Sequence, residues 1–100
     1  GIEDAISVAD LKARQNDYLL IDVREPDENA DLSIPGAVLI PKIYFENGRA
    51  FTDLPKDREI ILHCRSGVRS AQCLTLLRAA GFTNSTHLKG GIIAWEESKR

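Results

Sequence analysis

The chain contains no methionine, and it is poor in cysteine, in aromatic residues and in long apolar runs. Because it lacks methionine and starts at Gly1, we expect residues 1–100 to be a single domain excised from a longer protein. No apolar run approaches the roughly 20 residues of a membrane-spanning helix, and no signal-peptide pattern opens the chain. We therefore expect a cytoplasmic location and no membrane partner.

Cysteine is limited to two residues, Cys64 and Cys73. Two cysteines are too few to build a disulfide scaffold, and their separation across a loop and a helix places them poorly for pairing. The chain also has no CxxC motif and no second histidine or cysteine at ligand spacing, so we expect no metal site and no cofactor. Both thiols are therefore expected to be reduced.

Neither sign of charge is in excess. The 13 basic and 15 acidic residues give a net charge of −2, so no basic surface is predicted for nucleic acid or for an anionic membrane. The length of 100 residues and the hydrophobic content of 43% are typical of one globular domain with a modest core. No nucleic-acid partner is expected.

Short apolar runs alternate with segments of helical periodicity. Strands are predicted at residues 18–23, 37–40, 59–63 and 85–88, and helices at residues 8–15, at 70–80 and from Gly90-Gly91 onward. Pro26 is expected to end the segment after the first strand, and residues 42–58 to form a long connection with one helical turn. The alternation predicts an α/β domain with a mainly parallel sheet, whose site lies beyond the carboxyl ends of the strands.

Residues 64–69, CRSGVR, begin with a cysteine placed between a predicted strand and a predicted helix that opens at Ser70. A helix N-terminus presents unpaired amides and partial positive charge, Gly67 allows a tight turn, and Arg65 and Arg69 add two full charges. Lowering the pKa of a thiol by about two units requires roughly 2.7 kcal/mol, which two or three amide hydrogen bonds to a thiolate can supply. The pattern therefore predicts a reactive thiolate beside an anion site, without a catalytic histidine.

Several other polar residues have structural interpretations. Asp22 and Arg24 are expected to pair and to brace the loop, and His63 should point to the opposite face of the sheet from the cysteine that follows it. We expect His87 to be structural as well. Cys73 lies on the apolar side of its predicted helix, where packing is the simpler role, although a relay of sulfur to this thiol stays open.

Four segments in order resemble the rhodanese family. They are IDVREP at residues 21–26, IPGA at 34–37, CRSGVRS at 64–70, and the LKGG and tryptophan of residues 88–95. The similarity spans nearly the whole chain. Within the family, the CRSGVRS loop and the long stretch after the IPK of residues 40–42 are most similar to the C-terminal rhodanese domain of ubiquitin-activating-like adenylyltransferase/sulfurtransferases.

The resemblance implies a rhodanese-like α/β fold, with a mainly parallel five-stranded sheet flanked by helices on both faces. It also implies a thiosulfate sulfurtransferase, in which the Cys64 thiolate takes a sulfane sulfur from an anionic donor and passes it, as a persulfide, to a thiophilic acceptor. Expected partners are a ubiquitin-like sulfur-carrier protein or the adenylyltransferase domain of the same parent chain. The residues implied in substrate binding, with Asp22 and Arg24 in support, are Arg65, Ser66, Gly67, Val68, Arg69 and Ser70.

Two other functions are compatible with the same fold. The first is a cysteine phosphatase, because a histidine and a cysteine followed by a loop arginine are similar to the HCx5R pattern of that class. Here the spacing is Cys-x4-Arg, and the shorter loop suits a sulfur atom better than a phosphoryl group. The second is a non-catalytic interaction module, which the presence of Cys64 argues against.

Overall fold

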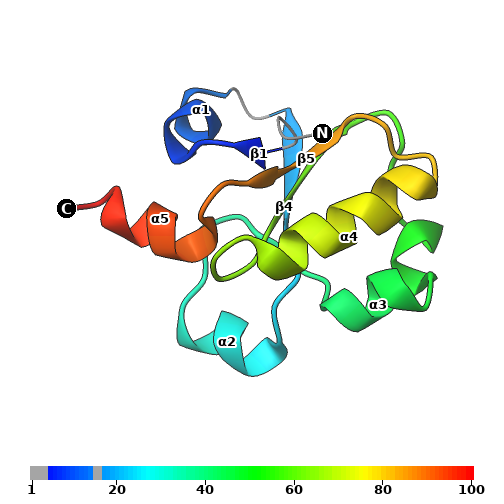
Figure 1. Ribbon diagram of the computed structural model, residues 1–100, viewed down its shortest axis with the longest axis horizontal. Helices are drawn as coiled ribbons and strands as arrows, with labels where there is room; N and C mark the ends of the chain where they lie inside the picture. Colours follow the sequence, from blue (N-terminus) through cyan, green and yellow to red (C-terminus); the bar gives the residue numbers. More distant parts are fainter. Residues whose placement is uncertain (1–4, 15–16) are drawn as a thin grey trace.

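A parallel five-stranded sheet forms the centre of the computed structural model, which describes residues 5–14 and 17–100 (Figure 1). Its strand order is β1-β5-β4-β2-β3, and the paired strands all run parallel. The strands are β1 (Ala5–Ile6), β2 (Tyr18–Asp22), β3 (Val38–Leu39), β4 (Glu59–His63) and β5 (Ser85–Leu88). The prediction of a mainly parallel five-stranded sheet is confirmed.

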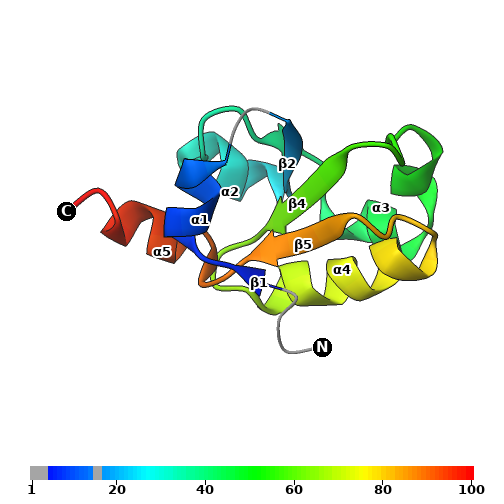
Figure 2. The ribbon, with the colours of Figure 1, turned by 90° about the horizontal axis from the view of Figure 1, so that it is seen from above.

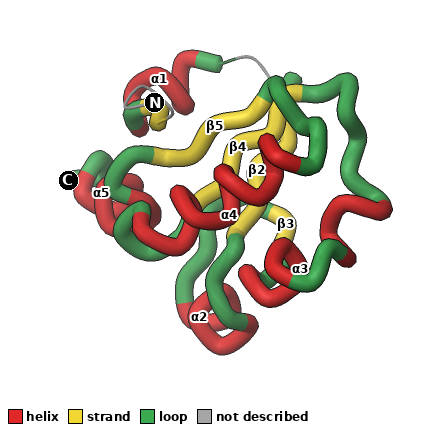
Figure 3. The backbone as a smooth tube through the Cα atoms, turned by 45° about the vertical axis from the view of Figure 1, so that its right-hand side comes forward, coloured by secondary structure: helices red, strands yellow, loops and turns green. Residues whose placement is uncertain are grey.

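Helices cover both faces of this sheet. Viewed from above, α1 and α5 lie on one side and α3 and α4 on the other (Figure 2), and α4 runs across the front of the strands in Figure 3. The helices are α1 (Val8–Ala13), α2 (Pro26–Asp31), α3 (Lys42–Glu46), α4 (Val68–Ala79) and α5 (Gly91–Glu97), with a 3-10 helix, η1, at Arg49–Thr52. The α/β class predicted from the alternating pattern is therefore confirmed.

Strand alternation divides the apolar side chains into two cores. On β4, Ile60 and Leu62 face α4, and Ile61 faces the opposite side. The α4 side also contains Ile21, Val23, Phe45, Ala50, Cys64, Cys73, Leu74, Leu77 and Phe82. The α1 side contains Leu11, Leu20, Ile34, Leu88 and Ile92. Because Cys64 continues the α4 side of β4, its sulfur lies beneath the start of α4.

The sequence pattern does not predict the helix α2. Pro26 is expected there only to end a segment, but proline is favoured in the first turn of a helix, and here it begins α2. A capping box supports this start, since the Glu25 amide donates to Glu28 Oε1 at 3.0 Å. Helix α2 places Glu28 close to the loop that follows β4, as described below.

Other boundaries also differ from the prediction. Helix α4 begins at Val68 and not at Ser70, because Gly67 adopts a left-handed φ of 120° and caps the helix. The expected connection at residues 42–58 contains both α3 and η1. Strand β1 is too short to give a period in the sequence. The last residue predicted for α1, Gln15, lies outside the described residues, and α1 ends at Ala13.

Candidate active site

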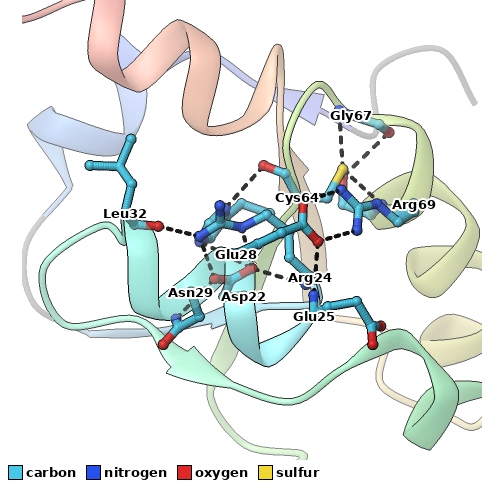
Figure 4. A network of polar contacts seen from close by, with 11 residues as sticks. Asp22, Arg24, Glu25, Glu28, Asn29, Leu32, Cys64, Gly67 and Arg69 are labelled. Carbon is cyan, nitrogen blue, oxygen red and sulfur yellow. Dashed lines mark hydrogen bonds and ion pairs between the residues drawn. The ribbon is translucent and has the colours of Figure 1, made fainter.

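The chain folds into a tight cradle between β4 and α4. Cys64 directly follows the last residue of β4, and the backbone turns back at Gly67, whose φ of 120° is unfavourable for residues with a side chain. The turn brings two amides to the sulfur, with Gly67 N at 3.1 Å and Ser70 N at 3.3 Å from Cys64 Sγ (Figure 4). The Ser70 hydroxyl lies 3.4 Å from the same sulfur. The predicted convergence of a helix start on Cys64 is therefore present.

This cradle favours the ionised form of the cysteine. Burial opposes charge and on its own raises the pKa of the Cys64 thiol, whose residue is only 1% exposed. Hydrogen bonds from the Ser70 hydroxyl and from the amides of Ser70, Gly67 and Ser66 outweigh burial, so the pKa lies below the ordinary value. The site can therefore present a thiolate without a general base in direct contact.

Arg69 is already paired with a carboxylate. Its Nη1 and Nη2 atoms donate to Glu28 Oε1 and Oε2 at 2.7 and 2.9 Å. The hydrogen bonds from Arg69 hold the pKa of Glu28 at about 2, so this carboxylate is charged at neutral pH. Glu28 is not among the residues predicted from the sequence, because the helix that carries it is not predicted either. The pair balances the charge of Arg69 and fastens α2 to the start of α4.

Arg65 differs from Arg69 in its surroundings. Its side chain is exposed, and among the described residues it has no ion-pair partner. It borders a cavity of about 310 Å³ between α2 and α5, which is also lined by Glu28, Leu32 and Ile93. Arg65 is therefore the exposed loop cation, in a cavity that the carboxylates of Asp31, Glu96 and Glu97 also line.

The loop carbonyls are held by the last helix. Ile92 N donates to Cys64 O at 2.9 Å, and Ile93 N donates to Arg65 O at 3.2 Å. A Cβ on Gly91 would collide with these same two carbonyl groups, which explains why a glycine stands at the start of α5. Gly91, the second of the two signature glycines, thus allows α5 to approach the active loop directly.

Asp22 and Arg24 form the buried pair that the sequence predicts, and their contacts extend to α2. Arg24 Nε and Nη2 donate to Asp22 Oδ1 and Oδ2 at 2.9 and 2.7 Å, and Nη2 also donates to Leu32 O at 2.6 Å (Figure 4). Asn29 Nδ2 adds a hydrogen bond to Asp22 Oδ2 at 3.0 Å. The pair thus holds α2, and Glu28 connects α2 to the loop.

The electrostatics of Asp22 fit this structural role. Burial raises the pKa of its carboxyl, but hydrogen bonds from Arg24 and Asn29 reverse the shift and keep the pKa below the ordinary value. The neighbouring His63 is fully buried, with Nδ1 at 3.2 Å from Cys64 O. Burial lowers the pKa of His63, so its imidazole is neutral at pH 7. His63 supports the backbone of the site from the other face of the sheet.

The second cysteine behaves as a packing residue. Cys73 is fully buried in the α4 core, and burial raises the pKa of its thiol to about 12. A thiol with this pKa stays protonated at neutral pH and is a poor nucleophile. These properties argue against the relay of sulfur through Cys73 that the sequence leaves open.

His87, for which the sequence suggests a structural role, touches the site. Its Nδ1 atom lies 2.8 Å from Ser70 Oγ. The register of the sheet indicates this position. His87 pairs with Leu62 of β4, and the side chains of Leu62 and Cys64 face the same side of the sheet. Strand parity therefore places the imidazole on the α4 side, beneath the active loop.

The structure gives no metal-binding group and no membrane helix in the residues it describes. Over 5–14 and 17–100, no cluster of three or more histidine, cysteine, aspartate or glutamate side chains could hold a metal ion. None of the helices in these ranges has the length and apolar character needed to cross a bilayer.

Comparison with known proteins identifies sulfurtransferase relatives. The probable adenylyltransferase/sulfurtransferase MoeZ of Mycobacterium tuberculosis is 49% identical over 76 residues, which cover 76% of this chain and 19% of that protein. A sulfurtransferase of Allochromatium vinosum is 38% identical over 92 residues, covering 92% of this chain and 84% of its own. Among solved structures, the human single-domain sulfurtransferase TSTD1 matches with a TM-score of 0.86 at 26% identity, covering 97% of this chain and 98% of its own.

The family assignment follows from these matches. This chain spans 19% of the length of the mycobacterial relative, so that similarity concerns one domain of a larger protein. The family model for the rhodanese-like domain matches residues 7–98, which include every strand except β1 and all five α-helices. The resemblance seen in the four sequence segments is confirmed. The chain therefore belongs to the rhodanese-like domain family, whose members include named sulfurtransferases.

Proposed function

We propose that this domain transfers a sulfane sulfur from an anionic donor such as thiosulfate to a thiophilic acceptor, through a persulfide on Cys64. The observation that carries the proposal is the convergence of the Gly67 amide, the Ser70 amide and the Ser70 hydroxyl on one sulfur atom. Such a cradle lowers the pKa of the thiol. Donors of the same loop can also stabilise negative charge on the terminal sulfur of a persulfide, which lies one S–S bond beyond Cys64 Sγ.

The reaction has two displacement steps. In the first, the Cys64 thiolate attacks the outer sulfur of thiosulfate, a new S–S bond forms, and the old S–S bond breaks with its electron pair leaving on sulfite. In the second, an acceptor thiolate attacks the terminal sulfur of the persulfide, and Cys64 leaves as the thiolate. No net oxidation or proton transfer by the protein is required, which agrees with a site built from hydrogen-bond donors.

Different residues of the loop bind different parts of the donor. We assign the amides and hydroxyls of residues 66–70 to the transferred sulfur, and the exposed cation of Arg65 to the sulfite group of the donor. Arg69, bound to Glu28, holds the loop against α2 and contributes less free charge than the sequence alone suggests. Asp22 and Arg24 support this arrangement through α2.

The acceptor is proposed to be another protein. Cys64 is 1% exposed, so a donor or acceptor must reach its sulfur past the rim of the loop. Beside this rim lies the cavity bordered by Arg65, with exposed apolar side chains at Leu32 and Ile93. The name of the mycobacterial relative couples an adenylyltransferase to a sulfurtransferase. We therefore propose a ubiquitin-like sulfur-carrier protein or an adenylyltransferase domain of the same parent chain as partner, in the cytoplasm.

Intact-mass spectrometry after treatment with thiosulfate tests the proposal. The protein should gain one sulfur atom, which cyanide or dithiothreitol removes, and Cys64→Ala should gain none. Cys73→Ala is the matched control and should gain the sulfur normally, because this thiol is protonated and buried. An unchanged mass, or sulfur uptake that depends on Cys73 and not on Cys64, would overturn the proposal.

A further inference from the structure

The hydroxyl of Ser70 connects the Cys64 sulfur to a histidine on the neighbouring strand. Ser70 is fully buried, with Oγ at 3.4 Å from Cys64 Sγ and at 2.8 Å from His87 Nδ1. We propose that His87 is a positioning residue, which donates its Nδ1 proton to Ser70 Oγ and thereby directs the Ser70 hydroxyl proton to the sulfur. This inference rests on the proposed role of Cys64 as the nucleophile.

The Ser70 hydroxyl has more acceptors around it than protons to donate. A serine hydroxyl has one proton to donate and can accept two hydrogen bonds. Three acceptors surround this hydroxyl, namely the sulfur, the Gly67 carbonyl at 3.3 Å, and His87 Nδ1 when that atom carries no proton. At 2.8 Å, a bare Nδ1 is the closest of the three and draws the hydroxyl proton away from the sulfur. A protonated Nδ1 removes this competitor and leaves the proton for the thiolate.

The sheet holds the His87 imidazole in a position from which it can donate to Ser70 Oγ. His87 on β5 pairs in register with Leu62 on β4, so the backbones that carry the histidine and the cysteine are joined by the parallel ladder. A side-chain Cβ at Gly67 would lie 3.9 Å from His87 Cε1, so the ring lies next to the turn of the loop. The imidazole therefore underlies the cradle as well as the hydroxyl.

The other charged and titratable groups near the sulfur do not mask the effect of the Ser70 hydrogen bond on the Cys64 thiolate. Arg69 of α4 interacts with Cys64, but Glu28 of α2 balances its charge. Burial lowers the pKa of His63 on β4 and raises the pKa of Cys73 on α4 to about 12, so both are neutral at pH 7. The stability of the thiolate thus depends strongly on the donors that point at it, among which the Ser70 hydroxyl is the one that can turn away.

The test is the pH dependence of alkylation of Cys64 by iodoacetamide, with the product at this residue quantified by peptide mass spectrometry. His87→Ala should raise the apparent pKa of the thiol by up to about one unit, because without the Nδ1–H donor the Ser70 hydroxyl is no longer oriented towards the sulfur and can donate to the Gly67 carbonyl at 3.3 Å instead. His87→Asn should restore most of the shift, since its amide NH2 can donate in place of Nδ1–H. In a Ser70→Ala background, His87→Ala should add little. Ser85→Ala, on the same strand with its hydroxyl donating to Phe82 O, is the control and should leave the profile unchanged.

Nitrogen-15 NMR of the unmodified protein gives a second readout that needs no variant to fold. In the thiolate state, the His87 resonances should show a proton on Nδ1. The inference is overturned by a bare Nδ1 in that state, by an unchanged alkylation profile in His87→Ala, by equal shifts in His87→Ala and His87→Asn, or by an undiminished effect in the Ser70→Ala background. Because no sulfur donor is used, these results stand apart from the persulfide test, and either proposal can fail without the other.

Discussion

Glu28 and Arg69 are separated by 41 positions in the chain, yet they form a two-point ion pair beside the reactive sulfur, with N···O distances of 2.7 and 2.9 Å (Figure 4). The pair has two consequences. It joins α2 to the first turn of α4, so that the position of the loop depends on a helix far away in sequence. It also places a carboxylate close to a site proposed to bind anions, so that removing this one negative charge should change the affinity for an anionic donor.

Glu28→Gln should strengthen the binding of an anionic donor. The glutamine oxygen can still accept a hydrogen bond from Arg69, so the contact between the helices is kept while one negative charge disappears. We expect the KM for thiosulfate to fall by about threefold at low ionic strength, the order expected for one partly screened charge. Steady-state kinetics at several salt concentrations measures this. A KM that rises in Glu28→Gln would show that the carboxylate is needed for loop geometry above all.

The same carboxylate should contribute to stability at neutral pH and lose that contribution in acid. Its pKa is about 2 in the folded protein against 4.5 for the free side chain, so folding favours the ionised form. The contribution is complete above about pH 5 and disappears as the pH falls through about 2. Urea unfolding should therefore show a wild-type advantage over Glu28→Gln that shrinks between about pH 6 and pH 2. An advantage that does not change with pH would contradict the assigned ion pair.

Neutralising Arg65 should raise the KM for an anionic sulfur donor. Arg65→Gln removes the loop cation that has no ion-pair partner among the described residues. The KM for thiosulfate should rise by about threefold to tenfold, its dependence on salt should flatten, and an uncharged persulfide donor should be affected less. Arg49→Gln, which changes net charge equally on η1, is the control. Equal losses for charged and uncharged donors would instead assign Arg65 to loop shape.

Gly91→Ala should damage both stability and turnover. The added methyl group meets the carbonyls of Cys64 and Arg65, at a φ of 58° that side chains rarely adopt. We expect a loss of about 2–5 kcal/mol in the free energy of unfolding and a lower kcat, because the loop must move. Gly48→Ala has a φ of 83° and nothing within 4 Å, so it should cost about 1–2 kcal/mol and leave kcat intact. Similar kinetics in the two variants would show that the close approach of Gly91 to the loop carbonyls does not matter for turnover.

The short loop should make the domain a poor phosphatase. The two amides of Gly67 and Ser70 lie 3.1 and 3.3 Å from the sulfur, so these donors converge on a single sulfur atom and not on the several oxygens of a phosphoryl group. Aryl phosphate hydrolysis should stay at background. Insertion of one residue between Gly67 and Val68 should reduce persulfide formation, because the amides lose their convergence. Robust phosphatase turnover that depends on Cys64 in the unmodified domain would overturn the sulfurtransferase proposal.

The sequence predicts the parts of the fold that have strong local signals. The continuous apolar runs at β2 and β4 and the apolar residues of the long helix α4 are visible in the sequence, and the order of these segments is enough to place Cys64 at a strand-to-helix junction. The two-residue strand β1 has too few residues for a period and depends on pairing with β5. Helix α2 has six residues and none of them is buried, so it shows no apolar stripe.

The site residues that the sequence does not reveal share a physical reason. Glu28 and His87 act through contacts with α4 that form only when distant segments are packed, and neither has a local pattern that indicates the contact. The charge of Arg69 is readable from the sequence, but its partner is not. For His87, strand parity places the ring on the correct face only once the register of β5 against β4 is known.

The carbonyls of the active loop give the site a further property. Because Ile92 and Ile93 hold the oxygens of Cys64 and Arg65, a peptide flip in the loop breaks a hydrogen bond to α5. The peptide plane that ends in Arg65 O also carries the Ser66 amide, one of the donors that lower the pKa of Cys64. In the proposed transfer, charge on sulfur can therefore appear, move outward by one atom and return while the main chain keeps its orientation. We expect the reorganisation energy of both proposed steps to be borne by the substrates and their water, and very little of it by the loop.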